Sequence, residues 1–351
     1  MSKPKPEITV FDPHTASDDL WKKLFDFYEK ILLEIFPDDP LPSRERIKKN
    51  LQNPDPNFKN YRWMIHSKEK DKVIGYGKVS IYDRSAPAYK MNKHIAFCDL
   101  SIDKKHRRLR LGSELLKIQV NKVKEEGKMI IQGGSHLKTG KAFCEQYGGK
   151  IALTEEESRL SLDEVDWKIV NEWITKGSQR TEGVTIAQFE IVPEEDIEEY
   201  CKLFTETLNQ VPKGELEWEE VETPVTRRIR EKHSKILNQT WTTIISKEKD
   251  GVISGLTETF YQPDQATLLY QGLTGVKKEY RGRGLGKWLK AEMLTYARKM
   301  FPEVRFVATD FAIINKPMIA INKQLGFRKY KIWNGYKFNV EELHKLLHSN
   351  D

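Results

Sequence analysis

The sequence has little of what marks secreted, membrane-spanning or metal-binding chains. Its 351 residues include only three cysteines, Cys98, Cys144 and Cys201, which are odd in number and far apart. They form neither a metal-ligand spacing nor a disulfide framework, which favours a reducing cytoplasm. No apolar run approaches the roughly 18 residues of a spanning helix, and the start, MSKPKPEITV, lacks the apolar core of a signal peptide. We therefore expect a cytoplasmic protein with no metal and no membrane partner.

The chain also lacks a strong excess of charge of one sign. Lys and Arg number 59 against 52 Asp and Glu, so the net charge is +7, and both signs are mixed along the sequence. A nucleic-acid-binding protein usually concentrates its basic residues on one face. The mixed pattern instead favours a solvated surface with local basic spots for an anionic ligand, and nucleic acid is not an expected partner.

What the sequence does contain is an internal repeat, and its length favours two domains. Three segments of the first half return in the same order and at nearly the same spacing in the second half. WMIHSKEKDKVIGYG (63–77), RRLRLG (107–112) and FCEQYGGK (143–150) correspond to WTTIISKEKDGVISG (241–255), RGRGLG (281–286) and INKQLGFRK (321–329). A single match of this kind arises by chance, but three in register indicate a tandem duplication.

The repeated unit has the pattern of a mixed α/β domain. In the second half, strands flank the turn KEKDG and another strand precedes the glycines. An apolar stripe of helical period runs from Leu285 to Met300, a short strand covers 304–309, and a helix over 315–325 ends at Gly326. We expect a first domain at 1–160, a linker at 161–183 that contains TKGSQRTEG, and a second domain at 184–351.

The most distinctive segment is RGRGLG, residues 281–286, between an expected strand and an expected helix. Free N–H groups and the helix dipole favour an anion at a helix start. The Walker A motif does not fit, because the interval between Gly282 and Gly286 is one residue short and Trp288 replaces the hydroxyl residue. The dinucleotide motif G-x-G-x-x-G requires a different interval. The pattern R/Q-x-x-G-x-G/A fits fully and predicts a pyrophosphate site.

This pattern and its surroundings resemble a known family. TGVKKEYRGRGLGKWLKAEML and ATDFAIINKPMIAINKQLGF resemble the acyl-coenzyme A signature, and the strand and helix after it, of the GNAT acyltransferase superfamily. The whole chain resembles N-acetyltransferases with two tandem GNAT domains, arranged as in mycothiol synthase. The resemblance implies a mixed α+β fold, in which each domain is a mostly antiparallel twisted sheet flanked by helices.

The resemblance also implies which residues of the second half bind the acyl donor, usually acetyl-CoA. A strand would pair its backbone with the pantetheine arm, the loop amides would hold the pyrophosphate, and Asn315 would lie near the thioester sulfur. The implied binding residues are Leu273, Thr274, Gly275, Val276, Arg281, Gly282, Arg283, Gly284, Leu285, Gly286, Lys287 and Asn315. Many members place a general-acid Tyr four residues before the glycine of GF. Asn322 stands there in this chain, which leaves the acid open.

Acyl transfer to an amine requires a neutral amine and therefore, for most amines, a base. A lysine-type amine of pKa about 10.4 lies about 3.4 units from neutrality at pH 7, which costs about 4.6 kcal/mol. An α-amino group of pKa near 8 costs only about 1 kcal/mol. We expect the catalytic residues to be Glu258, Tyr270 and Asn315, with Asp310 behind them. Core packing for Tyr270 and a solvated carboxylate for Glu258 remain open alternatives.

The first half carries the same loop with its glycines replaced. In RRLRLG, Arg110 stands where Gly284 stands in the second half. A non-glycine residue there must adopt a positive φ or direct its side chain at the phosphates. We therefore expect no productive coenzyme A binding in the first half, whose role would be to complete the fold and line the acceptor cleft.

Together these features predict an N-acetyltransferase whose active site lies in the C-terminal domain. The acceptor would be an amine of a small molecule or a peptide, and the protein would be a monomer or a homodimer. The alternative is an acyl-CoA-binding sensor or interaction protein without catalysis. The acidic run VPKGELEWEEVETP (211–224) is either an attractor for a cationic amine or a solvated loop.

Overall fold

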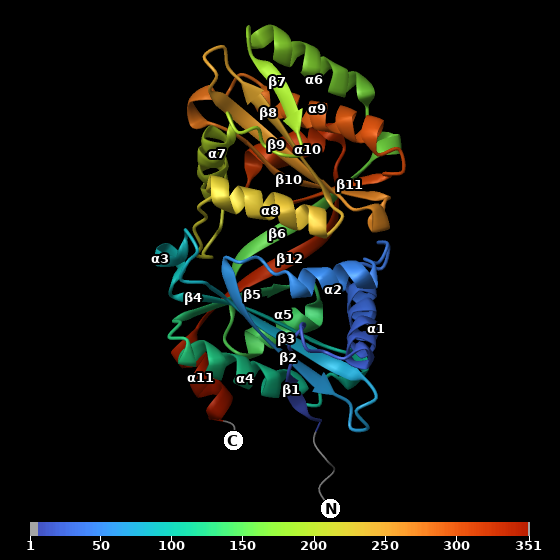
Figure 1. Ribbon diagram of the computed structural model, residues 1–351, viewed down its shortest axis with the longest axis vertical. Helices are drawn as coiled ribbons and strands as arrows, with labels where there is room; N and C mark the ends of the chain where they lie inside the picture. The colour runs from blue at the N-terminus through green and yellow to red at the C-terminus, as the bar shows by residue number, and fades with distance from the viewer. Residues whose placement is uncertain (1–5, 350–351) are drawn as a thin grey trace, which may run out of the picture. The chain divides into compact units, whose positions relative to one another are not determined.

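A computed structural model, which describes residues 6–349, divides the protein into two compact units (Figure 1). Unit 1 takes the chain up to Thr154, the short segment Lys213–Glu219 and the chain from Trp333 onward. Unit 2 takes Glu155–Pro212 and Glu220–Ile332. Across residues 6–349, no helix combines the length and the apolar character needed to cross a membrane.

Unit 1 is built on a mostly antiparallel sheet with the strand order β1-β2-β3-β4-β5-β12, in which only β4 and β5 pair in parallel. The strands are β1 (Ile8–Val10), β2 (Phe58–His66), β3 (Val73–Tyr82), β4 (Ile95–Ile102), β5 (Ile130–Ser135) and β12 (Arg328–Asn339). The helices are α1 (Asp18–Ile35), α2 (Arg44–Gln52), α3 (Tyr89–Asn92), α4 (Leu111–Glu125), α5 (Lys138–Gln146) and α11 (Val340–His348). The largest core cluster of the unit joins α4 and α11 to the sheet.

Unit 2 repeats this plan with the strand order β6-β11-β10-β9-β8-β7, in which β10 and β11 form the parallel pair. The strands are β6 (Lys150–Ser161), β7 (Thr185–Phe189), β8 (Thr240–Lys247), β9 (Ile253–Tyr261), β10 (Leu268–Val276) and β11 (Phe306–Ala312). The helices are α6 (Trp167–Arg180), α7 (Ile197–Asn209), α8 (Pro224–Ile236), α9 (Leu285–Met300) and α10 (Lys316–Leu325). The mixed α/β class and the mostly antiparallel sheet predicted from the sequence are confirmed.

Each unit is completed by the closing strand of the other half of the chain. β6, which closes the first half, pairs with β11 over 155–161, and β12, which closes the second half, pairs with β5 over 334–339. The following helices go with their strands, because α6 packs on α9 and α11 packs on α4. The halves expected at 1–160 and 184–351 therefore each contribute to both units, and the segment 161–183, expected as a linker, contains α6.

The helices predicted from periodicity lie close to their expected positions. In α9 the predicted stripe is buried from Leu285 to Ala297, whereas Met300 at its end is 51% exposed. Asn315 caps the N-terminus of α10, where its side chain accepts a hydrogen bond from the N–H of Met318. Gly326 ends α10 with φ 94°, in the left-handed region that favours glycine. The two predicted ends of α10 are thus confirmed.

Candidate functional site

The glycine loop, residues 281–286, connects β10 to α9 in unit 2. Gly282 and Gly284 have φ angles of 82° and 91°, and Gly284 is the N-cap of α9. A Cβ atom at either glycine would meet no heavy atom within 4 Å, so the loop faces open space at these positions. The N–H groups of the first helical turn have no carbonyl partner within their own helix. Those of Leu285 and Gly286 are therefore available to an anion that enters this space.

The basic side chains in the loop and directly after it are held by other parts of unit 2. The Arg281 Nε atom donates to the backbone oxygen of Val276 at 3.0 Å. Arg283 forms two hydrogen bonds, of 2.9 and 3.1 Å, with the carboxylate of Glu248. The Lys287 Nζ atom donates to Gln324 at 2.8 Å. These contacts brace the loop, so the backbone amides are its main free donors.

β10 leads into the glycine loop, but its parallel pairing with β11 ends several residues before the loop begins. The pairing of β10 with β11 in the described structure covers only Leu268–Tyr270, although β10 continues to Val276. On the other side, the register between β10 and β9 shifts between Gln271 and Thr274, as at a β-bulge. The backbone of β10 beyond Tyr270 therefore offers an edge to which an extended ligand can bind. This edge includes the predicted binding residues 273–276.

Unit 1 contains the same loop in the same backbone conformation. The Arg107 Nε atom donates to the backbone oxygen of Ile102 at 2.9 Å, as Arg281 does to Val276. In each unit this bond ties the first residue of the loop to the end of the strand before it. The duplication inferred from the sequence thus extends to individual side-chain contacts.

The two loops differ in the side chains that their open face carries. Arg108 and Arg110 occupy the positions of Gly282 and Gly284, with φ angles of 64° and 61°. Both arginines are exposed, and Leu109 between them is 62% exposed. From the sequence, Arg110 must either adopt a positive φ or direct its side chain at the phosphates. The structure shows the positive φ. The backbone of the cradle persists in unit 1, but long exposed side chains stand at the two positions that are glycine in unit 2.

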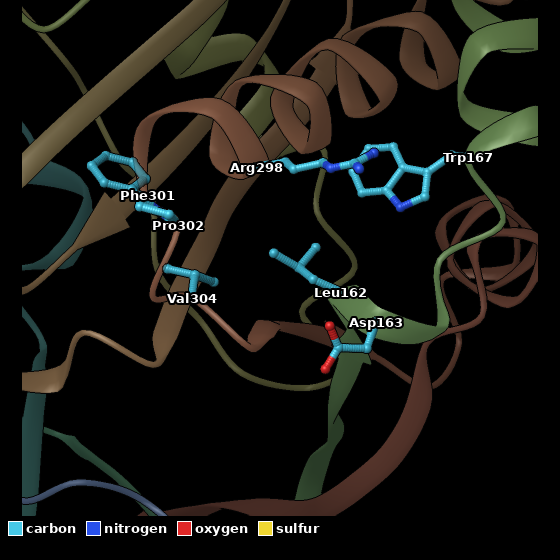
Figure 2. A pocket seen from close by; sticks show the side chains of 7 residues that line it. All are labelled: Leu162, Asp163, Trp167, Arg298, Phe301, Pro302 and Val304. Atoms are coloured by element: carbon cyan, nitrogen blue, oxygen red, sulfur yellow. The ribbon is translucent and has the colours of Figure 1, made fainter.

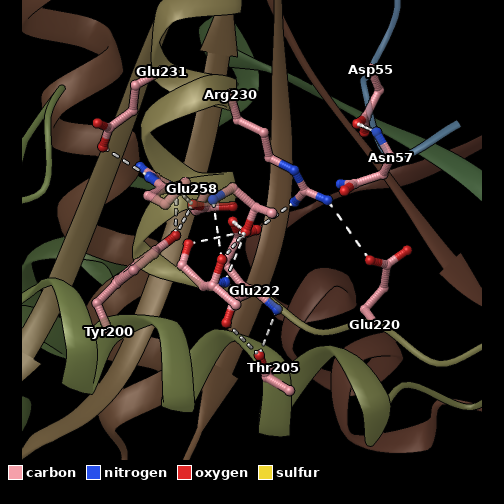
Figure 3. Close-up of polar contacts among 12 residues, drawn as sticks. Asp55, Asn57, Tyr200, Thr205, Glu220, Glu222, Arg230, Glu231 and Glu258 are labelled. Carbon is pink, nitrogen blue, oxygen red and sulfur yellow. Dashed lines mark hydrogen bonds and ion pairs between the residues drawn. The ribbon is translucent and has the colours of Figure 1, made fainter. Parts of the chain in front are cut away.

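Of the predicted catalytic residues, Glu258 lies in a buried polar network on β9 (Figure 3). It is 2% exposed, and its Oε1 atom accepts hydrogen bonds from the Arg227 guanidinium at 2.8 Å and from the Tyr200 hydroxyl. Arg227 is fully buried in α8, and its Nε atom also donates to Glu231 at 2.9 Å. Glu258 is therefore part of an ion pair that joins α8 to the sheet.

A second buried carboxyl in this region, Glu222, was not predicted as a site residue. It precedes α8, is 6% exposed, and accepts a hydrogen bond of 2.7 Å from the Thr226 hydroxyl (Figure 3). Burial raises the pKa of Glu222, whereas the ion pair with Arg230 at 2.7 Å acts against that shift. Its place in an acidic run suggests a solvated residue, so no sequence signal distinguishes it from its neighbours.

Tyr270 and Asp310 lie on the parallel strand pair. Tyr270 is half-buried on β10, where it pairs with Ala308 of β11. Asp310 follows two residues later on β11, beyond the last paired residue of β10. Surrounding protein and then the like charges of Glu157 and Glu155 raise the pKa of Asp310 to about 7. The Asp310 side chain is exposed, and Asp310 pairs directly with Glu157 on the neighbouring strand β6.

A separate hollow of about 300 Å³ lies beside the C-terminal end of α9 (Figure 2). Its lining includes Asp163, Trp167 and Arg298, and the Arg298 guanidinium stacks 4.4 Å from the centre of the Trp167 ring. This is the end of α9 opposite the glycine loop, where helix carbonyls disfavour an anion. In residues 6–349, no three His, Cys, Asp or Glu side chains gather so as to hold a metal ion.

Comparison with protein families identifies the chain. The model described as "Acetyltransferase (GNAT) family" matches residues 21–136 and 207–327, which together exceed half of the chain. The protein belongs to the acetyltransferase (GNAT) family. The two matches fall in the two halves of the duplication, so it is a tandem GNAT protein, as the resemblance implied. No curated protein matches the chain.

Solved structures share the fold of this GNAT protein. A tandem GNAT protein from the clavulanic acid biosynthesis pathway is 20% identical, with a TM-score of 0.75 over 96% of this chain and 99% of the other. A GCN5-related N-acetyltransferase from Sphaerobacter thermophilus is 15% identical, with a TM-score of 0.65 over 95% and 96%. N-myristoyltransferase from Saccharomyces cerevisiae is 13% identical, with a TM-score of 0.54 over 97% and 82%. At these identities the similarity shows the tandem fold alone.

Proposed function

We propose that unit 2 binds acetyl-CoA and transfers its acetyl group to an amine of a small molecule or a peptide. The observation that carries this proposal is the open glycine loop before α9, where Gly282 and Gly284 leave the helix N-terminus accessible. In unit 1, Arg108 and Arg110 occupy the equivalent positions. Unit 1 would then have a supporting role.

Successive parts of unit 2 would bind successive parts of an acyl-coenzyme A molecule. The amides of 283–286 would bind the pyrophosphate, and the edge of β10 over 273–276 would bind the pantetheine amides and orient the thioester. When bound, the coenzyme supplies an activated acyl group that an amine attacks directly. The N–H groups of the β10 bulge are suited to stabilise charge that develops on the carbonyl oxygen.

The base that accepts the proton of the amine is best assigned to Asp310, because it lies on β11 just past the last residue that pairs with β10, where the edge of β10 opens. Surrounding protein and the charges of Glu157 and Glu155 raise its pKa toward neutral pH, as a base requires. Glu258 already accepts hydrogen bonds from Arg227 and Tyr200, so its assignment as a catalytic residue, like that of Tyr270 and Asn315, stays a prediction.

The substitution Gly284→Arg tests the proposed donor site. It gives the loop of unit 2 the residue that unit 1 has at the same backbone position, so the fold is expected to accept it. The arginine side chain would enter the open space before α9, and we expect acetyl-CoA to bind at least about tenfold more weakly, which corresponds to about 1.4 kcal/mol. Isothermal titration calorimetry measures this loss.

The reciprocal substitution Arg110→Gly is the matched control, because it changes only unit 1. We expect it to leave the affinity for acetyl-CoA unchanged. Equal effects of the two substitutions, or no binding of acetyl-CoA by the unaltered protein, would contradict the proposal. Thiol release measured with a panel of amines separates the enzyme from a non-catalytic acyl-CoA sensor, since a sensor binds acetyl-CoA without releasing thiol.

A further inference from the structure

Unit 2 contains a fully buried lysine that the proposed function does not yet use. Lys290 lies on α9 and is 1% exposed. Its Nζ atom donates to the Oε1 atom of Gln271 at 2.6 Å and to the Oδ1 atom of Asn322 at 2.6 Å. No carboxylate in the described part of the chain is paired with it. Burial of a lysine among neutral partners is costly, so its presence calls for an explanation beyond packing.

The network around Lys290 fixes the orientation of one amide. The Asn322 Oδ1 atom accepts from the lysine, so its Nδ2 group is the atom of this amide that does not contact the ammonium. That Nδ2 group is buried and has no hydrogen-bond partner among the described residues, although Asn322 is only 1% exposed. An unpaired buried donor destabilises the folded chain. A ligand atom that accepts from Nδ2 would remove this cost.

The network lies where a thioester bound along β10 would end. Gln271 is the first residue of β10 beyond its pairing with β11. From there to Val276, next to the glycine loop, the strand spans roughly 17 Å at about 3.3 Å per residue, comparable with an extended pantetheine arm. α10 also runs beside the loop, since a Cβ at Gly286 would lie 3.9 Å from Ile321, the neighbour of Asn322.

We propose that Asn322 donates its Nδ2–H group to the sulfur that leaves the acyl thioester, and that Lys290 positions Asn322 and supplies positive charge beside that sulfur. This inference rests on the proposed function. The amine nitrogen forms a bond with the carbonyl carbon, the carbon–sulfur bond breaks, and its electron pair remains on sulfur as a thiolate. The amine gives its proton to the base, and Asn322 keeps its own proton.

The charge state of Lys290 is compatible with this role. Burial lowers the pKa of Lys290 to about 7, so the charged and neutral forms are both populated near neutral pH. The groups that face Lys290 from β10 and α10 are the neutral side chains Gln271 and Asn322, and the Phe327 ring lies 5.2 Å away. A thiolate would be the only negative charge in this network, and its presence favours the ammonium form.

The test is the pKa of the thiol of bound coenzyme A, read from the ultraviolet absorbance of the thiolate as pH is raised. The same titration with desulfo-coenzyme A, which lacks the sulfur, gives the background. Interference from the protein's thiols is small, because burial raises the pKa of Cys144 to about 11, that of Cys201 to about 12 and that of Cys98 still further.

In the unaltered protein we expect the thiol pKa to lie about one unit below that of free coenzyme A, a tenfold gain in thiolate. Lys290→Met and Asn322→Leu should each abolish most of this shift. Lys299→Met is the matched control, because it removes a positive charge from an exposed position of the same helix, and it should keep the shift. The affinity of each variant for desulfo-coenzyme A shows that it folds.

The outcomes separate this inference from the proposed function. If coenzyme A binds but its thiol pKa is the same in the unaltered protein and in Lys290→Met, the inference is overturned and the donor site stands. An equal loss of the shift in Lys299→Met would also overturn it, since the effect would then be general electrostatics. If coenzyme A does not bind at all, the proposed function fails and the inference fails with it.

Discussion

At the scale of single residues, Arg108 and Arg110 show that a loop can keep the backbone conformation of a binding loop while its glycines are replaced by long side chains. Both adopt the left-handed backbone that glycine adopts at the equivalent positions of unit 2. For a residue with a Cβ atom this conformation costs roughly 1–2 kcal/mol. The motif in the sequence predicted the glycine loop and the need for a positive φ at the position of Gly284 and Arg110, because that geometry follows from local sterics.

The strain at Arg110 leads to a prediction about stability. Because its side chain is exposed, Arg110→Gly removes the strained conformation and loses few contacts, although glycine adds entropy to the unfolded chain. We expect a gain of about 0.5–1 kcal/mol in the free energy of unfolding, measured by urea denaturation. Arg110→Ala, which keeps a Cβ atom, should show no such gain, and an equal gain in both variants would contradict the role of strain.

Asp310 leads to a prediction about the pH dependence of acyl transfer. A base acts in its deprotonated form, so kcat/KM should rise as the pH is raised through about 7, the pKa of this carboxyl. Asp310→Asn should remove this acidic limb and lower the rate by roughly 10²–10⁴-fold.

Glu157→Gln provides the control for Asp310, because it removes a neighbouring negative charge that raises the pKa of the carboxyl. The acidic limb should move to lower pH in this variant, as measured by a profile of kcat/KM against pH. A limb that persists unchanged in Asp310→Asn would assign the base to another residue.

At the scale of secondary-structure elements, the sequence predicts best where local signals suffice. The period of α9 and the capping residues Asn315 and Gly326 of α10 depend on neighbours in the chain. α8, with the sequence PVTRRIREKHSKI, was not predicted, because its charges suggest a solvated segment. In the structure Arg227 of α8 is fully buried against Glu258 of β9, a contact between segments that no local pattern specifies.

The buried ion pair of α8 leads to a prediction at this scale. Arg227→Met leaves the Glu258 carboxylate buried without its cation, which is expected to cost about 3–5 kcal/mol in the free energy of unfolding of unit 2. Hydrogen exchange should show the largest loss of protection in α8 and β8. The double variant Arg227→Met/Glu258→Gln should recover part of the loss, and a cost below about 1 kcal/mol in the single variant would refute the argument.

At the scale of the whole molecule, the duplication was predictable and the exchange of strands was not. Repeated segments reveal two copies of one unit because they depend on order and spacing alone. The patterns of β6 and β12 identify them as strands but do not specify a partner strand. That each closes the sheet of the other half follows only from the three-dimensional structure.

Because of this exchange, removal of the C-terminal end of the chain is expected to affect unit 1 rather than unit 2. A chain that ends at Ile332 lacks the part of β12 that pairs with β5, together with α11, which packs on α4. We expect faster hydrogen exchange in β5 and α4, whereas α9 and the affinity for acetyl-CoA should change little. Loss of protection first in α9 would contradict this division of the chain.

The exchanged strands also set the order in which a growing polypeptide can finish its parts. A ribosome makes most of unit 1 first, but β5, which has β4 on one side, must wait for the last strand of the chain, β12, before its second neighbour is made. Unit 2 has all of its residues once Ile332 has been made. Protease resistance of arrested nascent chains would show unit 2 protected before unit 1. Unit 1 is thus begun first and completed last, and until β12 is made β5 has an open strand edge that is prone to aggregation.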